Sequence, residues 1–82
     1  MQLNARHGWN HSPDSVLEVA EMTIKMGIPN GYTMIGHMYR DGYGKSQSYY
    51  EAARYYGLAQ QGGDAEGIYN LVRITTVDLF EY

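Results

Sequence analysis

Cysteine is absent from this chain of 82 residues, and basic side chains are scarce. Without cysteine, the chain can form no disulfide bond and offers no thiolate to a metal. Six lysines and arginines stand against nine acidic residues, and the net charge of −3 argues against nucleic-acid binding, which normally needs a basic face. No apolar run approaches the roughly 20 residues that a membrane-spanning helix needs. We therefore expect neither nucleic-acid binding nor membrane insertion.

The first residues also lack the apolar core of a signal peptide, which favours a soluble, cytoplasmic protein. The length allows one small domain over residues 1–82 with a modest core, and such chains often need a partner or oligomerisation for firm stability. Tyrosine is what the chain has in abundance, with nine against one phenylalanine and one tryptophan. Tyrosine combines apolar area with a polar tip and suits half-buried helix contacts and protein interfaces.

Local signals predict about four helices. Residues 1–12 show no periodicity and form an irregular lead-in, after which Ser12 is the expected N-cap and Pro13 the first helical residue. Gly27 is suited to end this helix in a left-handed conformation. The apolar stripe of this first helix has spacings of three and four and comprises Val16, Leu17, Val19, Ala20, Thr23 and Ile24.

The second helix should begin near residues 28–30, and its expected buried face comprises Tyr32, Ile35, Gly36 and Tyr39. Gly42 and Gly44 then permit the positive φ angles of a tight reversal. Ser46 or Ser48 can cap a third helix, which should run to residues 62–63.

A fourth helix should follow Asp64 as its cap, with Ala65, Ile68, Leu71 and Val72 facing inward. Residues 74–77 are β-branched and poor helix formers. We expect the helix to continue through them, and an extended tail is the alternative. These signals predict an all-α fold of antiparallel helix pairs.

A repeat of 36 residues runs through these helices. Four residues in the first half have identical counterparts, three of them glycine, and five apolar positions also correspond. The identical pairs are Gly8 and Gly44, Ser12 and Ser48, Gly27 and Gly63, and Gly31 and Gly67. The apolar pairs are Val16 and Ala52, Val19 and Tyr55, Met22 and Leu58, Tyr32 and Ile68, and Ile35 and Leu71. A period of this size is typical of stacked helical pairs.

Small and large residues alternate along the expected helix contacts. Small residues that permit close approach are Gly31, Gly36, Ala52, Ala59 and Gly67, and bulky residues that fill the spaces are Tyr39, Tyr55 and Tyr56. Such alternation gives interlocking packing, so a structural role for these residues is the first interpretation.

Residues 31–66 resemble one complete Sel-one-like repeat, a relative of the tetratricopeptide repeat. The resemblance rests on Ile35, Gly36, Tyr39, Gly42, Gly44, Ala52, Tyr55, Tyr56, Ala59 and Gly63, and Gly31 opens the repeat in place of the usual alanine. It implies a short α/α solenoid with incomplete terminal repeats, in which 13–27 is the second helix of a partial repeat and 67–82 a divergent capping helix and tail. Departures from the family pattern are Gly31, Lys45 and Gln60, and in the last copy Val72, Thr75 and Asp78.

The resemblance also implies that the first helix of the leading repeat is missing. Residues 13–26 should then present an apolar flank with no covering neighbour in this chain. An exposed apolar patch of several hundred Å² usually marks an interaction surface or an aggregation risk. We expect either a fragment of a longer solenoid or a surface covered by a second copy or a partner.

Catalytic and metal-binding motifs are weak. His7 and His11 have a spacing that suits a metal, but Gly8 separates them and no further ligand lies nearby, so exposed loop histidines are expected. No nucleophile is placed beside a base, and Gly42-Tyr43-Gly44 lacks the remainder of a phosphate-binding loop. We expect neither an enzyme nor a cofactor or metal site.

Protein binding is the remaining class of function. The candidate partner-binding residues are Trp9, Met34, His37, Met38 and Tyr43. Tryptophan is common at interface hot spots, and methionine adapts to irregular surfaces. The alternatives are that the methionines fill the core and that Trp9 folds over the uncovered flank of the first helix.

The resemblance implies adaptor or scaffold work rather than catalysis. Residues 27–38 are similar to small bacterial repeat proteins suspected of neutralising secreted toxins. An immunity protein that binds a toxin or effector is therefore the narrower expectation, and a homo-oligomeric scaffold or a signalling adaptor is the alternative.

Overall fold

The computed structural model describes residues 9–78, and within them it contains helices and no strand. The helices are α1 (Pro13–Lys25), α2 (Asn30–Asp41), α3 (Tyr49–Gln61) and α4 (Ala65–Arg73), followed by a π-helical segment (Ile74–Asp78). The predicted all-α fold of four helices is confirmed. Among the described helices, none is long and apolar enough to cross a bilayer.

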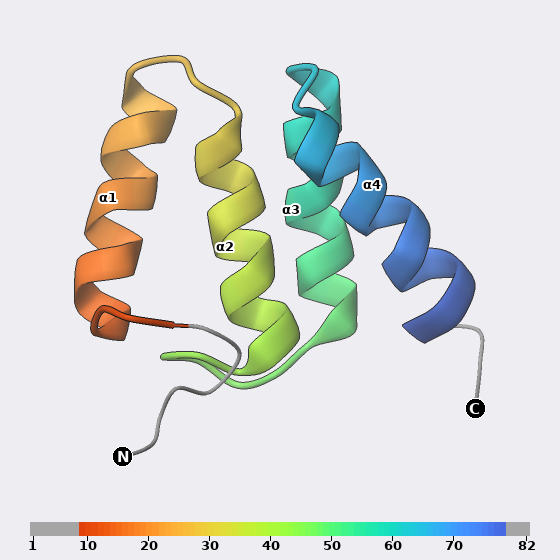
Figure 1. The fold of residues 1–82 in the computed structure, drawn as a ribbon, viewed down its shortest axis with the longest axis horizontal. Helices are drawn as coiled ribbons and strands as arrows, with labels where there is room; N and C mark the ends of the chain where they lie inside the picture. The colour runs from red at the N-terminus through yellow and green to blue at the C-terminus, as the bar shows by residue number, and fades with distance from the viewer. Residues whose placement is uncertain (1–8, 79–82) are drawn as a thin grey trace.

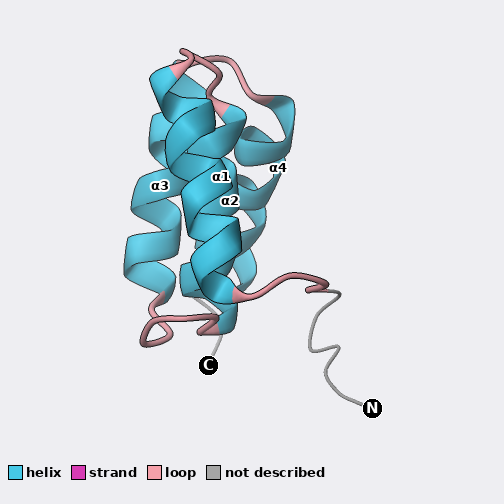
Figure 2. Cartoon of the chain, turned by 90° about the vertical axis from the view of Figure 1, so that its left-hand side faces the viewer, coloured by secondary structure: helices cyan, strands magenta, loops and turns pink. Residues whose placement is uncertain are grey.

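The first three helices lie side by side and alternate in direction (Figure 1). α4 crosses obliquely over α3, and α2 contacts both of these helices as well as α1. The molecule measures 36 × 32 × 18 Å, so the row is thin in one direction. Figure 2 looks along the row from the side of α1, with α2 and α3 behind it. Each end of the row is thus formed by one helix, α1 at one end and α4 at the other.

Side-chain caps begin three of the four helices. The cap oxygens of Ser12, Ser48 and Asp64 each accept a hydrogen bond from the backbone N–H three residues on, at 3.2, 3.1 and 2.9 Å. A cap of this kind satisfies one of the unpaired N–H groups at a helix start. Ser48, rather than Ser46, therefore caps α3.

α1 and α3 are alike in length and in their caps. α1 and α3 each have 13 residues, begin 36 residues apart and carry a serine cap. The turns that follow them each hold a left-handed glycine, Gly27 at φ +81° and Gly63 at φ +86°. The α1–α2 and α3–α4 hairpins thus share their local geometry. The predicted counterpart of Gly44 is Gly8, which lies outside the described residues.

Three glycines permit close helix approaches. A Cβ atom on Gly31 would lie 2.6 Å from the carbonyl oxygen of Ala20 on α1. On Gly36 it would lie 2.5 Å from the ring of Tyr56 on α3, and on Gly67 it would lie 2.5 Å from Cβ of Ala59. Each distance is too short for a real Cβ atom, so the predicted role of small residues at these crossings is confirmed.

The core is formed mainly where α2, α3 and the C-terminal helical segment meet. Tyr56 and Ala52 are fully buried on α3, and Ile74 packs with them. Gly42 and Gly44 have φ of +68° and +80° and turn the chain between α2 and α3, as predicted.

The buried face of α2 is wider than predicted. Ile35 and Gly36 are buried as expected, but Tyr32 and Tyr39 are only half-buried. Thr33 and Met38 are the unexpected members, because α2 is covered on one side by α1 and on the other by α3 and α4.

The predicted inward face of α4 is wrong. Ala65, Ile68 and Val72 are exposed, and only Leu71 of the predicted set packs against the core. Gly67 fixes the rotation of the helix, since it is the residue that fits against α3. The inward positions are therefore those of Gly67, Leu71 and Ile74.

The β-branched residues after α4 remain helical. The Thr75 hydroxyl donates to the Leu71 carbonyl at 2.7 Å, and the Thr76 hydroxyl to the Val72 carbonyl at 2.7 Å. Hydroxyl groups of this kind bond back to the preceding turn. The helical expectation is confirmed over 74–78, and residues 79–82 lie outside the described part of the chain.

Candidate functional site

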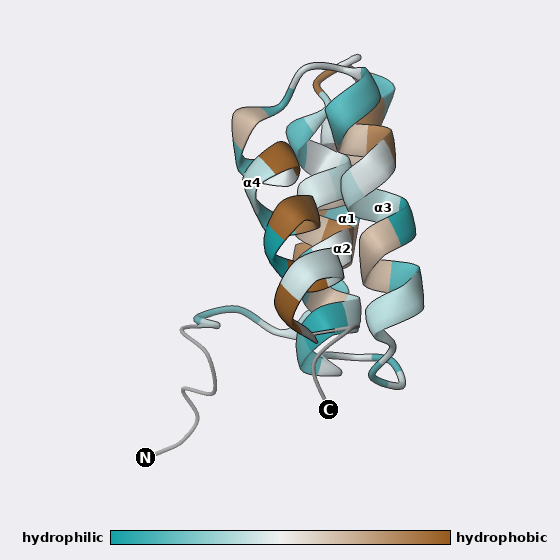
Figure 3. Ribbon diagram, turned by 90° about the vertical axis from the view of Figure 1, so that its right-hand side faces the viewer, coloured by the Kyte–Doolittle hydropathy of each residue, from teal (hydrophilic) through white to brown (hydrophobic). Residues whose placement is uncertain are grey.

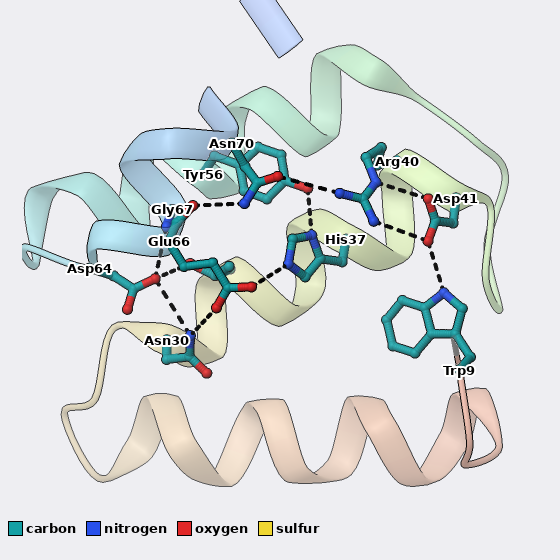
Figure 4. A network of polar contacts seen from close by, with 11 residues as sticks. Trp9, Asn30, His37, Arg40, Asp41, Tyr56, Asp64, Glu66, Gly67 and Asn70 are labelled. Atoms are coloured by element: carbon teal, nitrogen blue, oxygen red, sulfur yellow. Dashed lines mark hydrogen bonds and ion pairs between the residues drawn. The ribbon is translucent and has the colours of Figure 1, made fainter. Parts of the chain in front are cut away.

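A polar network joins α2 to α3 and α4 at His37 (Figure 4). The Nδ1 atom of His37 lies 2.7 Å from the hydroxyl oxygen of Tyr56, and its Nε2 atom lies 3.0 Å from a carboxylate oxygen of Glu66. Because a carboxylate only accepts, the Nε2–H of His37 is the donor to Glu66, and the other ring nitrogen pairs with the Tyr56 hydroxyl. The predicted partner-binding residue His37 is therefore already bonded within the fold, with 18% of its side chain exposed.

The order Glu66–His37–Tyr56 has the form of an acid, a base and a hydroxyl group, which is the arrangement of a nucleophile-activating triad. Tyr56, however, is fully buried beneath α2, so a substrate has no access to its hydroxyl. Burial raises the pKa of Tyr56 to about 12, which further disfavours the phenolate. The geometry suits a hydrogen-bonded link between three helices rather than chemistry.

A second polar centre surrounds Asp64 at the start of α4. One of its carboxylate oxygens accepts hydrogen bonds from the Thr33 hydroxyl at 2.6 Å and from the Gly67 amide at 2.9 Å, with Asn30 at 3.5 Å. Burial opposes ionisation here, but these hydrogen bonds outweigh it and hold the pKa of Asp64 below its ordinary value. The same bonds satisfy Thr33, whose side chain is buried.

Trp9 and Tyr43 form a stacked pair beside the end of α2. Their ring centroids are 4.5 Å apart with planes at 9°, and the indole N–H of Trp9 donates to Asp41 at 2.9 Å. The Tyr43 hydroxyl donates to the carbonyl of His11. Trp9 therefore does not cover the flank of α1. It anchors the lead-in to the α2–α3 loop. Both aromatic side chains are half-buried.

The two predicted methionines differ in exposure. Met38 is 1% exposed, so its prediction as a partner-binding residue is wrong and its alternative as core filler is right. Met34 is half-buried and borders a shallow apolar groove between α1 and α2, together with Val16 and Val19. His11 also lines this groove.

Within residues 9–78, no group of three or more histidine, aspartate or glutamate side chains is placed to hold a metal ion. His7 lies outside the described residues.

One end of the molecule exposes an apolar edge on α1. Val19, Met22 and Met26 are 52, 58 and 70% exposed and follow one another at spacings of three and four. They lie on a different side of α1 from the buried Val16 and Ala20. The α1 edge, as we name these three residues, is the uncovered flank that the sequence predicted.

The other end exposes an apolar edge on α4. Ile68, Tyr69 and Val72 are 37, 61 and 55% exposed, and Figure 3 shows hydrophobic segments along α4 where it faces the viewer. We name these three residues the α4 edge. Sequence reasoning missed it because Ile68 and Val72 were placed inward. The sequence does hold a signal for the α4 edge, because this edge forms a second apolar stripe beside the stripe of Leu71 and Ile74.

Comparisons with protein-family models, curated proteins and solved structures find no match to this chain. The candidate site is therefore defined by its own geometry, namely two exposed apolar edges held apart by a close-packed and hydrogen-bonded centre.

Proposed function

We propose that this chain is a non-catalytic protein-interaction module that binds other proteins through the apolar edges of its end helices. The observation that carries the proposal is the exposure of Val19, Met22 and Met26 in a single row. Rows of large apolar side chains at a helix surface are what helical partners bury. The α4 edge provides a second such row at the opposite end.

A solenoid of Sel-one-like repeats is the architecture that we propose for this module. The shared geometry of the two hairpins supports it, since Ser12 and Ser48 cap equivalent helices and Gly27 and Gly63 turn equivalent loops. In such solenoids each repeat covers its neighbour, and the end repeats are left with uncovered surface unless they are polar. Here the end helices are not polar along their outer edges.

The polar groups of the chain support a role without catalysis, cofactor or metal. Within residues 9–78, His37 pairs with the hydroxyl group of Tyr56 and Asp64 with that of Thr33, and both hydroxyl-bearing residues are buried away from a substrate. Asp64 and Asn30 are likewise engaged in holding α2 against α4.

The narrower proposal is an immunity protein whose partner is a toxin or effector. It rests on the resemblance of residues 27–38 and is consistent with the net charge of −3 and the nine tyrosines, which suit a surface that blocks another protein. Within this proposal Met34, Trp9 and Tyr43 stay candidate contacts, because each is partly exposed.

Co-expression with the product of the adjacent gene tests this function. We expect a complex that co-purifies, and restored growth if that product is toxic. Met22→Glu should abolish the complex, because it buries an unpaired charge in the interface, whereas Gln60→Glu adds the same charge at an exposed position of α3 and should leave it intact. A complex that tolerates charges on both apolar edges would refute the proposed surfaces.

A further inference from the structure

The α1 edge occupies positions that have covered counterparts on α3. A shift of 36 residues carries Val19, Met22 and Met26 onto Tyr55, Leu58 and Gly62. In α3 these residues face α2. The Tyr55 ring lies 6.4 Å from that of Tyr32 and 5.6 Å from that of Tyr39, and a Cβ atom on Gly62 would lie 2.5 Å from Pro29 at the start of α2.

The α4 edge has covered counterparts on α2. The same shift carries Tyr32 and Gly36 onto Ile68 and Val72. A Cβ atom on Gly36 would lie 2.5 Å from the Tyr56 ring of α3, and Tyr32 lies beside Tyr55. Two positions of α2 that meet α3 therefore correspond to the exposed Ile68 and Val72, whereas Tyr69 corresponds to Thr33, which bonds to Asp64.

The two exposed edges are thus the two halves of one junction, the one that joins α2 to α3 inside the chain. We propose that the occupant of each edge is a second copy of this chain, with α4 of one copy packed head to tail against α1 of the next. This inference rests on the proposed interaction function and names the partner for the two edges.

The pair formed by Gly36 and Tyr56 at the junction is not reproduced at the two edges, because Tyr56 corresponds to Ala20, which is fully buried within the chain. The proposed contact therefore depends on the exposed edge residues alone. Met22, in place of Leu58, supplies an adaptable side chain at the rim.

Charged side chains lie beside the two edges, with Glu18, Glu21 and Lys25 exposed on α1 and Glu66 and Arg73 exposed on α4. Neither apolar edge contains a charged residue, and both are continuous along their helices. The net charge of −3 on each copy is the main electrostatic cost of association. Added salt screens this repulsion, so association should strengthen as ionic strength rises.

In a dimer held by one head-to-tail contact, each copy keeps one edge free. Such a contact is heterologous, and it continues into longer assemblies unless the rotation closes a ring. This separates it from a symmetric dimer, in which the α1 edges or the α4 edges of two copies would cover each other.

Sedimentation velocity over a dilution series of the full chain tests the inference with two blocking variants. Met22→Glu blocks the α1 edge, and Val72→Glu blocks the α4 edge. The wild-type chain should form dimers and larger species as concentration rises, and each variant alone should associate at least about tenfold more weakly. An equal mixture of the two variants should form a dimer that stops there, because each supplies one intact edge.

Gln60→Glu is the matched control, since it carries the same added charge on the exposed surface of α3. It should assemble like the wild-type chain, and circular dichroism should show equal helicity for all four proteins. A wild-type chain that is monomeric at every concentration would overturn the inference. So would a dimer that persists in either variant alone, or a mixture that remains monomeric.

Failure here is distinguishable from failure of the proposed function. A monomeric wild-type chain whose complex with the adjacent gene's product is lost on Met22→Glu would reject self-assembly and keep the interaction module. If charges on both edges removed neither the self-assembly nor the complex, both self-assembly and the interaction module would be rejected.

Discussion

The α2–α3 junction and the two ends of the row use equivalent positions but very different neighbours. At the junction, Gly36 lets the Tyr56 ring approach, and Tyr32 and Tyr55 lie side by side. At the ends, the positions that correspond to Tyr55, Tyr32 and Gly36 carry Val19, Ile68 and Val72, which are at least 37% exposed, whereas the counterpart of Tyr56 is the buried Ala20. The comparison teaches that exposure at these positions follows from the lack of a neighbouring helix among residues 9–78, and not from a change to polar residues.

The largest expected effect is at the centre of the junction. Gly36→Leu should destabilise the fold by about 3 kcal/mol, because the new side chain must displace the Tyr56 ring. Thermal and urea unfolding followed by circular dichroism measure this. Gly57→Ala is the control, since no atom lies within 4 Å of a Cβ atom there, and it should stabilise α3 by about 0.5 to 1 kcal/mol. Unchanged unfolding of Gly36→Leu would show that the junction is wrongly placed.

Tyr56→Phe should lower the free energy of unfolding by about 1 to 2 kcal/mol, because it leaves a ring nitrogen of His37 without its partner. Urea unfolding at pH 7 measures this loss.

The Tyr56 hydroxyl also predicts that stability depends on pH. The unfolded chain releases this proton near the ordinary pKa of 10.0 and the folded chain only near 12, so stability that is complete below pH 10 is lost as the pH rises toward 12. Urea midpoints from pH 9 to 12 should fall less steeply for Tyr56→Phe. Parallel curves for the two proteins would contradict a buried, neutral Tyr56.

Asp64→Ala should cost about 1 to 2 kcal/mol, and Ser12→Ala, which removes an exposed cap, about 0.5 kcal/mol. The difference arises because Asp64 also accepts the hydroxyl of buried Thr33. The stability contributed by Asp64 is complete above its ordinary pKa and is lost as the pH falls through its lower folded-state pKa. Urea unfolding of both variants at pH 7 and at acid pH provides the measurement. Equal losses for the two caps would disprove the inward role of Asp64.

The smallest effect on folding is expected at the ends. Met22→Glu should change the stability of the dilute monomer by no more than about 0.5 kcal/mol, because surface substitutions away from special features seldom do more. Unfolding at low micromolar concentration, below any association, is the measurement. A loss as large as that of Asp64→Ala would mean that α1 buries Met22 within the monomer.

Local features of the structure were predictable from the sequence. The caps at Ser12, Ser48 and Asp64 and the turns at Gly27 and Gly63 depend on residues only a few positions apart, and all were confirmed. Their physical cause is the chemistry of helix ends, which needs no knowledge of the remaining chain.

Several features that depend on contacts between distant residues were not predictable. α4 carries two apolar stripes, and only the fit of Gly67 against Ala59 decides which of them faces inward. Trp9 meets Asp41 across 32 residues, and His37 meets Glu66 across 29, with no local pattern to indicate either bond. The partner-binding role predicted for Met38 failed for the same reason, because α2 is covered on two sides.

A tandem of two copies most directly tests whether the α4 and α1 edges pack together as α2 and α3 do. Joining residue 77 of the first copy to residue 6 of the second keeps the spacing of the repeat, so that α4 of the first copy can pack against α1 of the second. Val72→Glu in the first copy should then cost at least about 2 kcal/mol by buried charge, whereas the same change in the second copy should cost about 0.5 kcal/mol or less, measured by urea unfolding. Equal costs at the two sites would show that the edges are not halves of one interface.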